Sequence, residues 1–143
     1  MFKGISYFQV PALSNQDFFH QANIYMGAHN DIGNWGEAKA CEYLQENGFD
    51  VLSKNYRYQH AEIDVIAKKG NLLIFVEVKT RTGSGFGMPE EFVNYSKAKL
   101  ILKAAENYIY ATNWLAEIRF DIISIIIFPD GNLNIRHIED AFY

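Results

Sequence analysis

The sequence predicts a mixed α/β fold in which one helix precedes three strands and a second helix precedes two more. Two observations carry this prediction. In two well-separated segments, apolar residues recur three or four positions apart, which is the pattern of a helix with one buried face. Between and after these segments, short runs rich in β-branched and aromatic residues are bounded by turn residues, as is typical of strands. At 143 residues, the chain has the size of one domain.

The first helix and the three strands after it make up the first half of this pattern. Asp31 or Asn34 can cap the helix at its start, and Gly48 can close it in the left-handed conformation. Three strands follow in close succession, at residues 49–58, 62–67 and 72–80. The turn between the last two contains Gly70, where a positive φ costs little. We therefore expect an antiparallel meander.

The second half begins with a glycine-rich segment at residues 80–89, which predicts a mobile loop. A helix at residues 96–111 and two strands, at 119–128 and 133–138, complete the pattern. We assign residues 31–143 to one domain. Residues 1–30 lack periodicity and are expected to form an irregular N-terminal extension, with Met26 as an alternative start of the natural chain.

Composition and charge exclude several classes of protein. The single cysteine excludes a disulfide framework, and no apolar run is long enough to cross a bilayer. The net charge is −4, but residues 54–103 carry nine basic and five acidic side chains, a local net charge of +4. A basic centre between acidic flanks can hold a polyanion, and an unevenly charged solvated surface is the alternative interpretation.

The middle strands carry the candidate site. Because side chains alternate along a strand, Glu77 and Lys79 share one face of the third strand with Leu73 and Phe75. Asp64 lies on the preceding strand, which the tight turn places beside the third. Two carboxylates and an ammonium would then converge at the end of an apolar strand pair. Such charges are costly to bury unless they pair or bind an ion.

This set of side chains contains the parts of a metal-dependent phosphodiesterase. Mg²⁺ is bound by one or two carboxylates and keeps waters for a substrate phosphate. The cation would polarise the phosphodiester, while the lysine positions or deprotonates the attacking water. An acid-x-Lys motif also arises by chance, and Glu37-Ala38-Lys39 fits it on a helix. On these residues alone, a purely structural ion-pair cluster remains an equal alternative.

Glu37 is the third informative acid. It lies on the same helix stripe as Cys41 and Leu44, and it is flanked by Gly33 and Gly36. Glycine normally lowers helix stability, so the two glycines indicate that something approaches the helix backbone closely. The alternative is a first-turn glutamate that the helix dipole favours.

Five motifs, taken in order along the chain, resemble one family. They are Gly33-Asn34-Trp35-Gly36-Glu37, Asn55-Tyr56-Arg57, Glu62-Ile63-Asp64-Val65-Ile66, Phe75-Val76-Glu77-Val78-Lys79-Thr80-Arg81 and Arg119-Phe120-Asp121-Ile122-Ile123. The set resembles the YraN-type family of small bacterial proteins. That family is similar to Holliday junction resolvases and to restriction endonucleases of the PD-(D/E)xK superfamily. The resemblance covers the chain from Asp31 to Phe142.

This resemblance implies an αβββαβ restriction-endonuclease-like core and a catalytic site that uses Mg²⁺ or Mn²⁺. Matched residue by residue, Asp64 and Glu77 correspond to the metal-binding acids, Lys79 to the active-site lysine and Glu37 to the helix glutamate of the resolvase-like branch. The carbonyl of Val78 completes the implied metal ligands. Basic side chains expected near substrate phosphate are Arg57, Arg81, Lys97 and Lys99. For Asp121 we expect a structural role.

The leading hypothesis is a Mg²⁺-dependent endonuclease that acts on structured DNA in the bacterial cytoplasm, with no membrane partner. The alternative is a catalytically silent nucleic-acid-binding or scaffolding module with the same fold. Fold resemblance alone does not establish either function. The shape of the DNA substrate and the oligomeric state, with a homodimer as one option, stay open.

Overall fold

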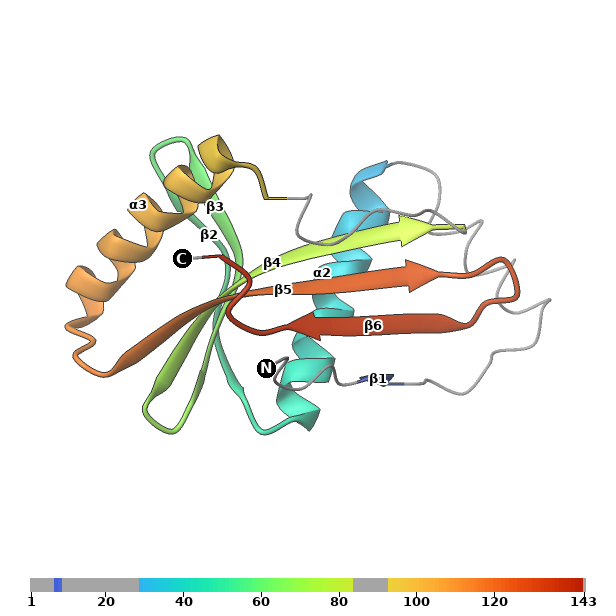
Figure 1. The fold of residues 1–143 in the computed structure, drawn as a ribbon, viewed down its shortest axis with the longest axis horizontal. Coiled ribbons are helices and arrows are strands. Elements are labelled where there is room, and N and C mark those ends of the chain that lie inside the picture. The colour runs from blue at the N-terminus through green and yellow to red at the C-terminus, as the bar shows by residue number, and fades with distance from the viewer. Residues whose placement is uncertain (1–6, 9–28, 84–92, 143) are drawn as a thin grey trace.

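A computed structural model describes residues 7–8, 29–83 and 93–142 of the chain (Figure 1). Its elements are β1 (Tyr7–Phe8), α2 (His29–Glu46), β2 (Asp50–Tyr58), β3 (Ala61–Lys69), β4 (Leu72–Thr82), α3 (Tyr95–Thr112), β5 (Glu117–Ile127) and β6 (Leu133–Ile138). From α2 to β6 the order is helix, three strands, helix, two strands. The mixed α/β fold with an αβββαβ core is therefore confirmed.

The strands form one sheet in the order β1-β6-β5-β4-β3-β2. As the turn residues predict, β2, β3 and β4 are an antiparallel meander. β5 runs parallel to β4, and α3 provides the crossover between them. β6 returns antiparallel to β5. The predicted site residues thus lie near the middle of the sheet, on β3 and β4.

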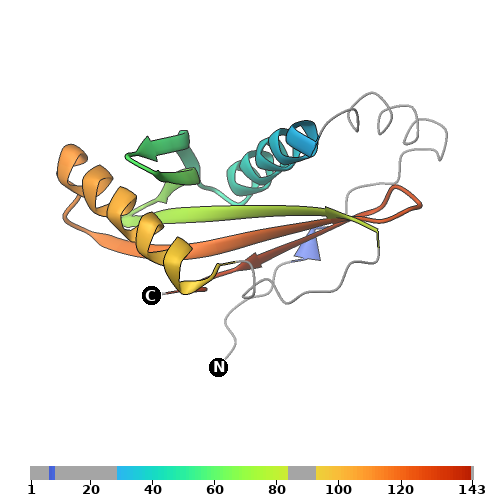
Figure 2. The same ribbon diagram turned by 90° about the horizontal axis from the view of Figure 1, so that it is seen from above.

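The two helices cover opposite faces of the central strands. On β4, Ile74 and Val76 belong to the apolar cluster under α2, whereas Leu73 and Phe75 belong to the cluster under α3. This alternation follows from the two-residue period of a strand buried on both faces. Figure 2 shows β4, β5 and β6 nearly edge-on, with α2 on one side of them.

The sheet opens between β3 and β4. These strands pair from Lys69↔Leu72 to Val65↔Val76 and no further, although β2 and β3 stay paired as far as Tyr58↔Ala61. The tip of the β2–β3 hairpin leaves the sheet and packs against α3, with Ile63 in the α3 cluster (Figure 1). We call the point where β3 parts from β4, just beyond the Val65–Val76 pair, the strand split.

One sequence prediction about α2 is wrong. The helix begins at His29, so Asp31 and Asn34 lie inside it and do not cap it. Glu37 is therefore two turns into the helix, where a first-turn dipole effect does not apply. Cap preferences are local, and they cannot separate a true cap from a polar residue one turn further in. The predicted end is confirmed, because Gly48 has the left-handed φ of 85°.

Two further predictions concern segments that the structure describes only in part. Of the predicted N-terminal extension, the described residues are β1, which pairs with β6, and the first two residues of α2. Residues 1–6 and 9–28, and residues 84–92 of the glycine-rich segment, lie outside the described residues. Neither α2 nor α3, the helices of the described part, is long and apolar enough to cross a membrane.

Candidate functional site

Asp64 lies at the strand split and bridges it. Its Oδ2 accepts a hydrogen bond of 2.8 Å from the backbone N–H of Val78 on β4. The side chain thereby replaces a backbone partner at the point where the β3–β4 ladder ends. A strand residue presents its N–H and C=O to the same neighbour, so the carbonyl of Val78 is directed toward the same edge. The split therefore brings the Val78 carbonyl and the Asp64 carboxylate to the same edge of β4.

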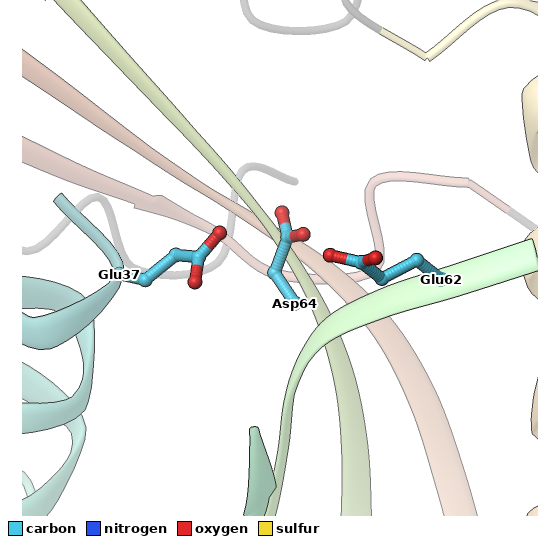
Figure 3. Close-up of side chains that lie close together, drawn as sticks. All are labelled: Glu37, Glu62 and Asp64. Atoms are coloured by element: carbon cyan, nitrogen blue, oxygen red, sulfur yellow. The ribbon is translucent and has the colours of Figure 1, made fainter. Parts of the chain in front are cut away.

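Three carboxylates meet at the split. Glu37 arrives from α2, whereas Glu62 and Asp64 come from β3, and one oxygen of each lies within 4.8 Å of the others (Figure 3). Glu62 also accepts a hydrogen bond of 2.7 Å from Nε of Arg57 on β2. Glu37 is hydrogen-bonded by the side chain of Asn55. These acids come together because Glu37 lies two turns into α2 and because β3 parts from β4 before Val65.

Glu77 is the fourth acid, and it is paired with two lysines. Its side chain is only 3% exposed, and its Oε1 lies 3.3 Å from Nζ of Lys79 on the same strand. Lys97, from the first turn of α3, donates a hydrogen bond to the same oxygen. Glu77 and Lys79 thus face the α3 side of the sheet, as their two-residue spacing predicts. Lys97 brings a second ammonium into the site, where the sequence indicated only a phosphate contact.

Burial and crowding of acids shift the protonation of the site. Burial, and then the charge of Glu77, raise the pKa of Asp64 to about 7, although the Val78 hydrogen bond acts in the opposite direction. Burial also raises the pKa of Glu37, with Glu62 and Glu77 adding to the effect and the Asn55 hydrogen bond reducing it. Perturbed carboxyl groups of this kind cluster at catalytic and metal-binding sites.

Two members of the site escaped the sequence analysis as site residues. Glu62 is two positions from Asp64 on one strand, the same spacing that linked Glu77 to Lys79, so alternation could have found it. Asn55 adopts a left-handed φ of 51° within β2. Asparagine tolerates this conformation better than most residues, and strained backbone is often found at functional sites. No spacing rule reveals that its side chain reaches Glu37.

Gly36 allows α2 to approach β4 beside the site. A Cβ atom at Gly36 would lie 1.7 Å from Oγ1 of Thr80, the residue after Lys79. At Gly33 a Cβ would meet nothing within 4 Å. The expectation that a glycine here reflects a close approach is therefore confirmed for Gly36 and wrong for Gly33. The contact fixes the helix that carries Glu37 against the strand that carries Glu77 and Lys79.

We expect Gly36→Ala to destabilise the protein by about 1–3 kcal/mol, because α2 must move away from Thr80 to admit the methyl group. Gly33→Ala is the matched control. It is expected to stabilise the protein by up to about 1 kcal/mol, since alanine has a higher helix propensity than glycine and position 33 is exposed. Urea unfolding of both variants measures the difference. Equal effects of the two substitutions would contradict the close approach.

The four predicted phosphate-binding residues lie differently with respect to the acids. Lys97 enters the site, and Arg57 borders it through Glu62. Arg81 is exposed on β4, two residues beyond Lys79. Lys99 is exposed on α3, with its Nζ 4.6 Å from the ring centroid of Tyr95. Residues two apart on a helix point in different directions, so Lys99 does not share the face of Lys97.

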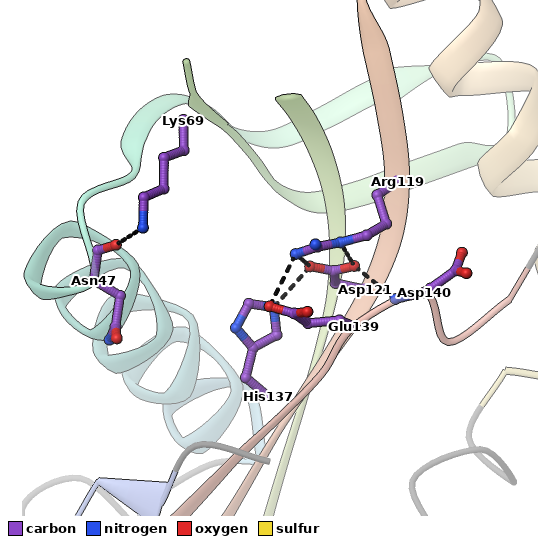
Figure 4. A network of polar contacts seen from close by, with 7 residues as sticks. All are labelled: Asn47, Lys69, Arg119, Asp121, His137, Glu139 and Asp140. Atoms are coloured by element: carbon purple, nitrogen blue, oxygen red, sulfur yellow. Dashed lines mark hydrogen bonds and ion pairs between the residues drawn. The ribbon is translucent and has the colours of Figure 1, made fainter. Parts of the chain in front are cut away.

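Asp121 forms a separate buried network (Figure 4). Fully buried on β5, it accepts two 2.8 Å hydrogen bonds from Arg119 and lies 2.7 Å from Nε2 of His137 on β6. The backbone N–H of Asp140 donates a further bond of 3.1 Å. Burial raises the pKa of Asp121, but the hydrogen bonds from His137 and Arg119 outweigh it and lower the pKa below its ordinary value. The network joins β5, β6 and the C-terminal turn.

The fold and the site together define a small mixed α/β protein with an acid and lysine cluster at a split in its central sheet. The chain belongs to the uncharacterised protein family UPF0102, which matches residues 36–125. It is 45% identical to a UPF0102 protein of Flavobacterium psychrophilum over 118 residues, 82% of this chain and 98% of the relative. A UPF0102 protein of Christiangramia forsetii is 46% identical over the same shares. One of Dictyoglomus turgidum is 47% identical over 80% of this chain and 98% of its own.

The family resemblance drawn from the five motifs is thus confirmed. The family match runs from Gly36 to Ile125, so it includes the four acids, both lysines and the Arg119–Asp121 pair.

Proposed function

We propose that the protein is a divalent-metal-dependent nuclease that hydrolyses phosphodiester bonds in structured DNA. One observation carries the proposal. Three carboxylates from α2 and β3 meet at the strand split, Glu77 on β4 lies close enough for its charge to act on Asp64, and the pKa of Asp64 is raised to about 7. Two ammonium groups, from β4 and α3, contact Glu77. A site that crowds acids in this way is unfavourable by itself and favourable around a cation.

The donor set fits a hard divalent cation. Mg²⁺ and Mn²⁺ prefer oxygen ligands, and opposite oxygens of an octahedral Mg²⁺ site lie about 4.2 Å apart. The oxygens of Glu37, Glu62 and Asp64 already lie within 4.8 Å of one another. These three acids, with Glu77 and the Val78 carbonyl, are the residues that would hold the cation. When bound, it supplies Lewis-acid stabilisation of a phosphodiester.

The remaining groups fit the other needs of phosphodiester hydrolysis. Lys79 lies at the edge of the cluster with its side chain 34% exposed, where its ammonium can hold an attacking water or protonate a leaving oxygen. Lys97 contacts Glu77, Arg57 contacts Glu62, and Arg81 is exposed on β4 two residues beyond Lys79. Their positive charge belongs to the basic centre of the chain and favours a polyanion such as DNA.

A nucleic-acid-binding or scaffolding module without turnover is the second candidate. One contact favours it, because Lys79 and Lys97 already neutralise Glu77 and leave it less free to bind a cation. In that interpretation the cluster is a structural ion network that joins α3 to β4.

A cleavage assay separates the two candidates. We expect the protein to cut four-way-junction, flap, duplex or single-stranded DNA in Mg²⁺ or Mn²⁺, to leave 5′-phosphate ends and to stop in EDTA. Glu77→Gln should abolish cleavage. Glu42→Gln, at the exposed carboxylate paired with Lys39 on α2, is the matched control and should cut normally. If the protein binds these DNAs but cuts none of them in either metal, the module without turnover is correct.

A further inference from the structure

Lys97 holds the carboxylate of Glu77 from a different element. Glu77 is almost fully buried on β4, and Lys97 reaches it from α3, twenty residues later in the chain. The second lysine, Lys79, contacts the same oxygen from a neighbouring position on β4. Both ammonium groups are therefore directed at Oε1 of one carboxylate. The Lys97 contact is the closer of the two.

The backbone of Lys97 is fixed, whereas its ammonium can move. Asn94 caps α3, and its side chain accepts a hydrogen bond of 2.9 Å from the backbone N–H of Lys97. Beyond this anchor lies a four-carbon stem with rotatable bonds. The side chain is 35% exposed, so one end of its range is the buried Glu77 and the other is open to solvent. The ammonium of Lys97 can thus exchange partners without any change in the helix.

A divalent cation and Lys97 compete for the same group. A cation held by the acids at the split would lie beside the ammonium that now neutralises Glu77, and two positive charges on one buried carboxylate repel each other. Lys79 is less able to leave, because it shares the strand with Glu77 and lies only two residues away. Lys97 is the group whose departure frees the carboxylate.

Resting on the proposed metal-dependent function, we propose that Lys97 exchanges Glu77 for a backbone phosphate of the DNA when the cation binds, so that cation and DNA binding are coupled. Without cation, Lys97 neutralises Glu77 and keeps the acid cluster stable. With both partners present, Glu77 would become a ligand of the cation, and Lys97 would gain a phosphate oxygen, a strong partner for a lysine. Each partner then raises the affinity for the other by the same factor, as linkage requires.

Isothermal titration with Mn²⁺ alone tests the first half of the exchange. The Lys97→Met substitution removes the competing ammonium. The variant should bind Mn²⁺ at least about tenfold more tightly than the wild type, because the cation no longer has to displace an ammonium group from Glu77. Lys97→Gln, which keeps a hydrogen-bond donor for Glu77, should do the same and guards against a folding defect. Lys103→Met, an exposed lysine on the same helix, is the control and should match the wild type.

The second half is tested by repeating the Mn²⁺ titration with four-way-junction DNA present, in the Lys79→Met background so that the DNA stays intact. The DNA should tighten Mn²⁺ binding when Lys97 is present and have a clearly smaller effect when it is replaced. Equal or weaker Mn²⁺ affinity in both folded Lys97 variants would overturn the exchange and leave the proposed function standing. If neither the wild type nor the Lys97 variants bind Mn²⁺, both the exchange and the proposed metal-dependent function are wrong.

Discussion

Lys79→Met should lower the rate constant of DNA cleavage by about 10²- to 10⁴-fold, the range that a positioned acid or base contributes. Metal binding and folding should be retained. The reason is that Glu77 keeps Lys97 as its partner when Lys79 is removed, so no buried carboxylate is left without a counter-charge. Single-turnover cleavage and Mn²⁺ titration on the same protein separate the loss of chemistry from any loss of binding.

The chain provides its own control for this experiment. Glu37-Ala38-Lys39 has the same acid-x-Lys pattern as Glu77-Val78-Lys79, but on α2 the ammonium of Lys39 lies 2.8 Å from Glu42, one helical turn further on. Lys39→Met should therefore cut at the wild-type rate. If Lys39→Met and Lys79→Met lose activity equally, or if Lys79→Met loses metal binding in parallel with cleavage, Lys79 does not have the proposed role.

The contrast between these two motifs shows which parts of the fold could be predicted from sequence. Periodicity separates Glu77 and Lys79, on a strand where residues two apart share a face, from Glu37 and Lys39, on a helix where they do not. The same periodicity gives the order of the elements from α2 to β6 and the antiparallel meander. Local signals were weaker at the start of α2, because Asp31 and Asn34 have cap preferences and yet lie inside a helix that begins at His29.

The composition of the site was harder to predict, since it depends on where the sheet opens. No residue pattern marks Val65 as the point where the pairing of β3 with β4 begins, yet the unpaired part of β3 before it lets Glu37 and Glu62 approach Asp64. The entry of Lys97 depends on how α3 packs over β4. Such tertiary contacts have no period in the sequence. The family motifs contain both Asp64 and Glu77. Only the structure shows that Asp64 lies beside Glu62, whereas Glu77 contacts two lysines.

Asp64→Asn should stabilise the metal-free protein at pH 8, and the gain should disappear on acidification. The pKa of this carboxyl rises from 3.8 in its ordinary state to about 7 in the folded protein, because of burial and then the charge of Glu77. Between these values the folded state binds more protons than the unfolded state, so wild-type stability falls as the pH rises from about 4 to 7. Below about pH 4 the carboxyl is protonated in both states, and above pH 7 the full cost is present.

Urea unfolding at pH 4.5, 6 and 8 in EDTA measures this difference, which should reach about 4 kcal/mol at most, as one pKa unit is worth about 1.4 kcal/mol. Asparagine keeps an oxygen that can accept the Val78 hydrogen bond. Asp50→Asn, at an exposed position at the start of β2, controls for removal of a charge. Mg²⁺ should then stabilise the wild type at pH 8 but not Asp64→Asn, since the cation binds the folded carboxylate. If Asp64→Asn stabilised the protein equally at every pH, this explanation would be wrong, because the cost of burying the Asp64 charge depends on pH.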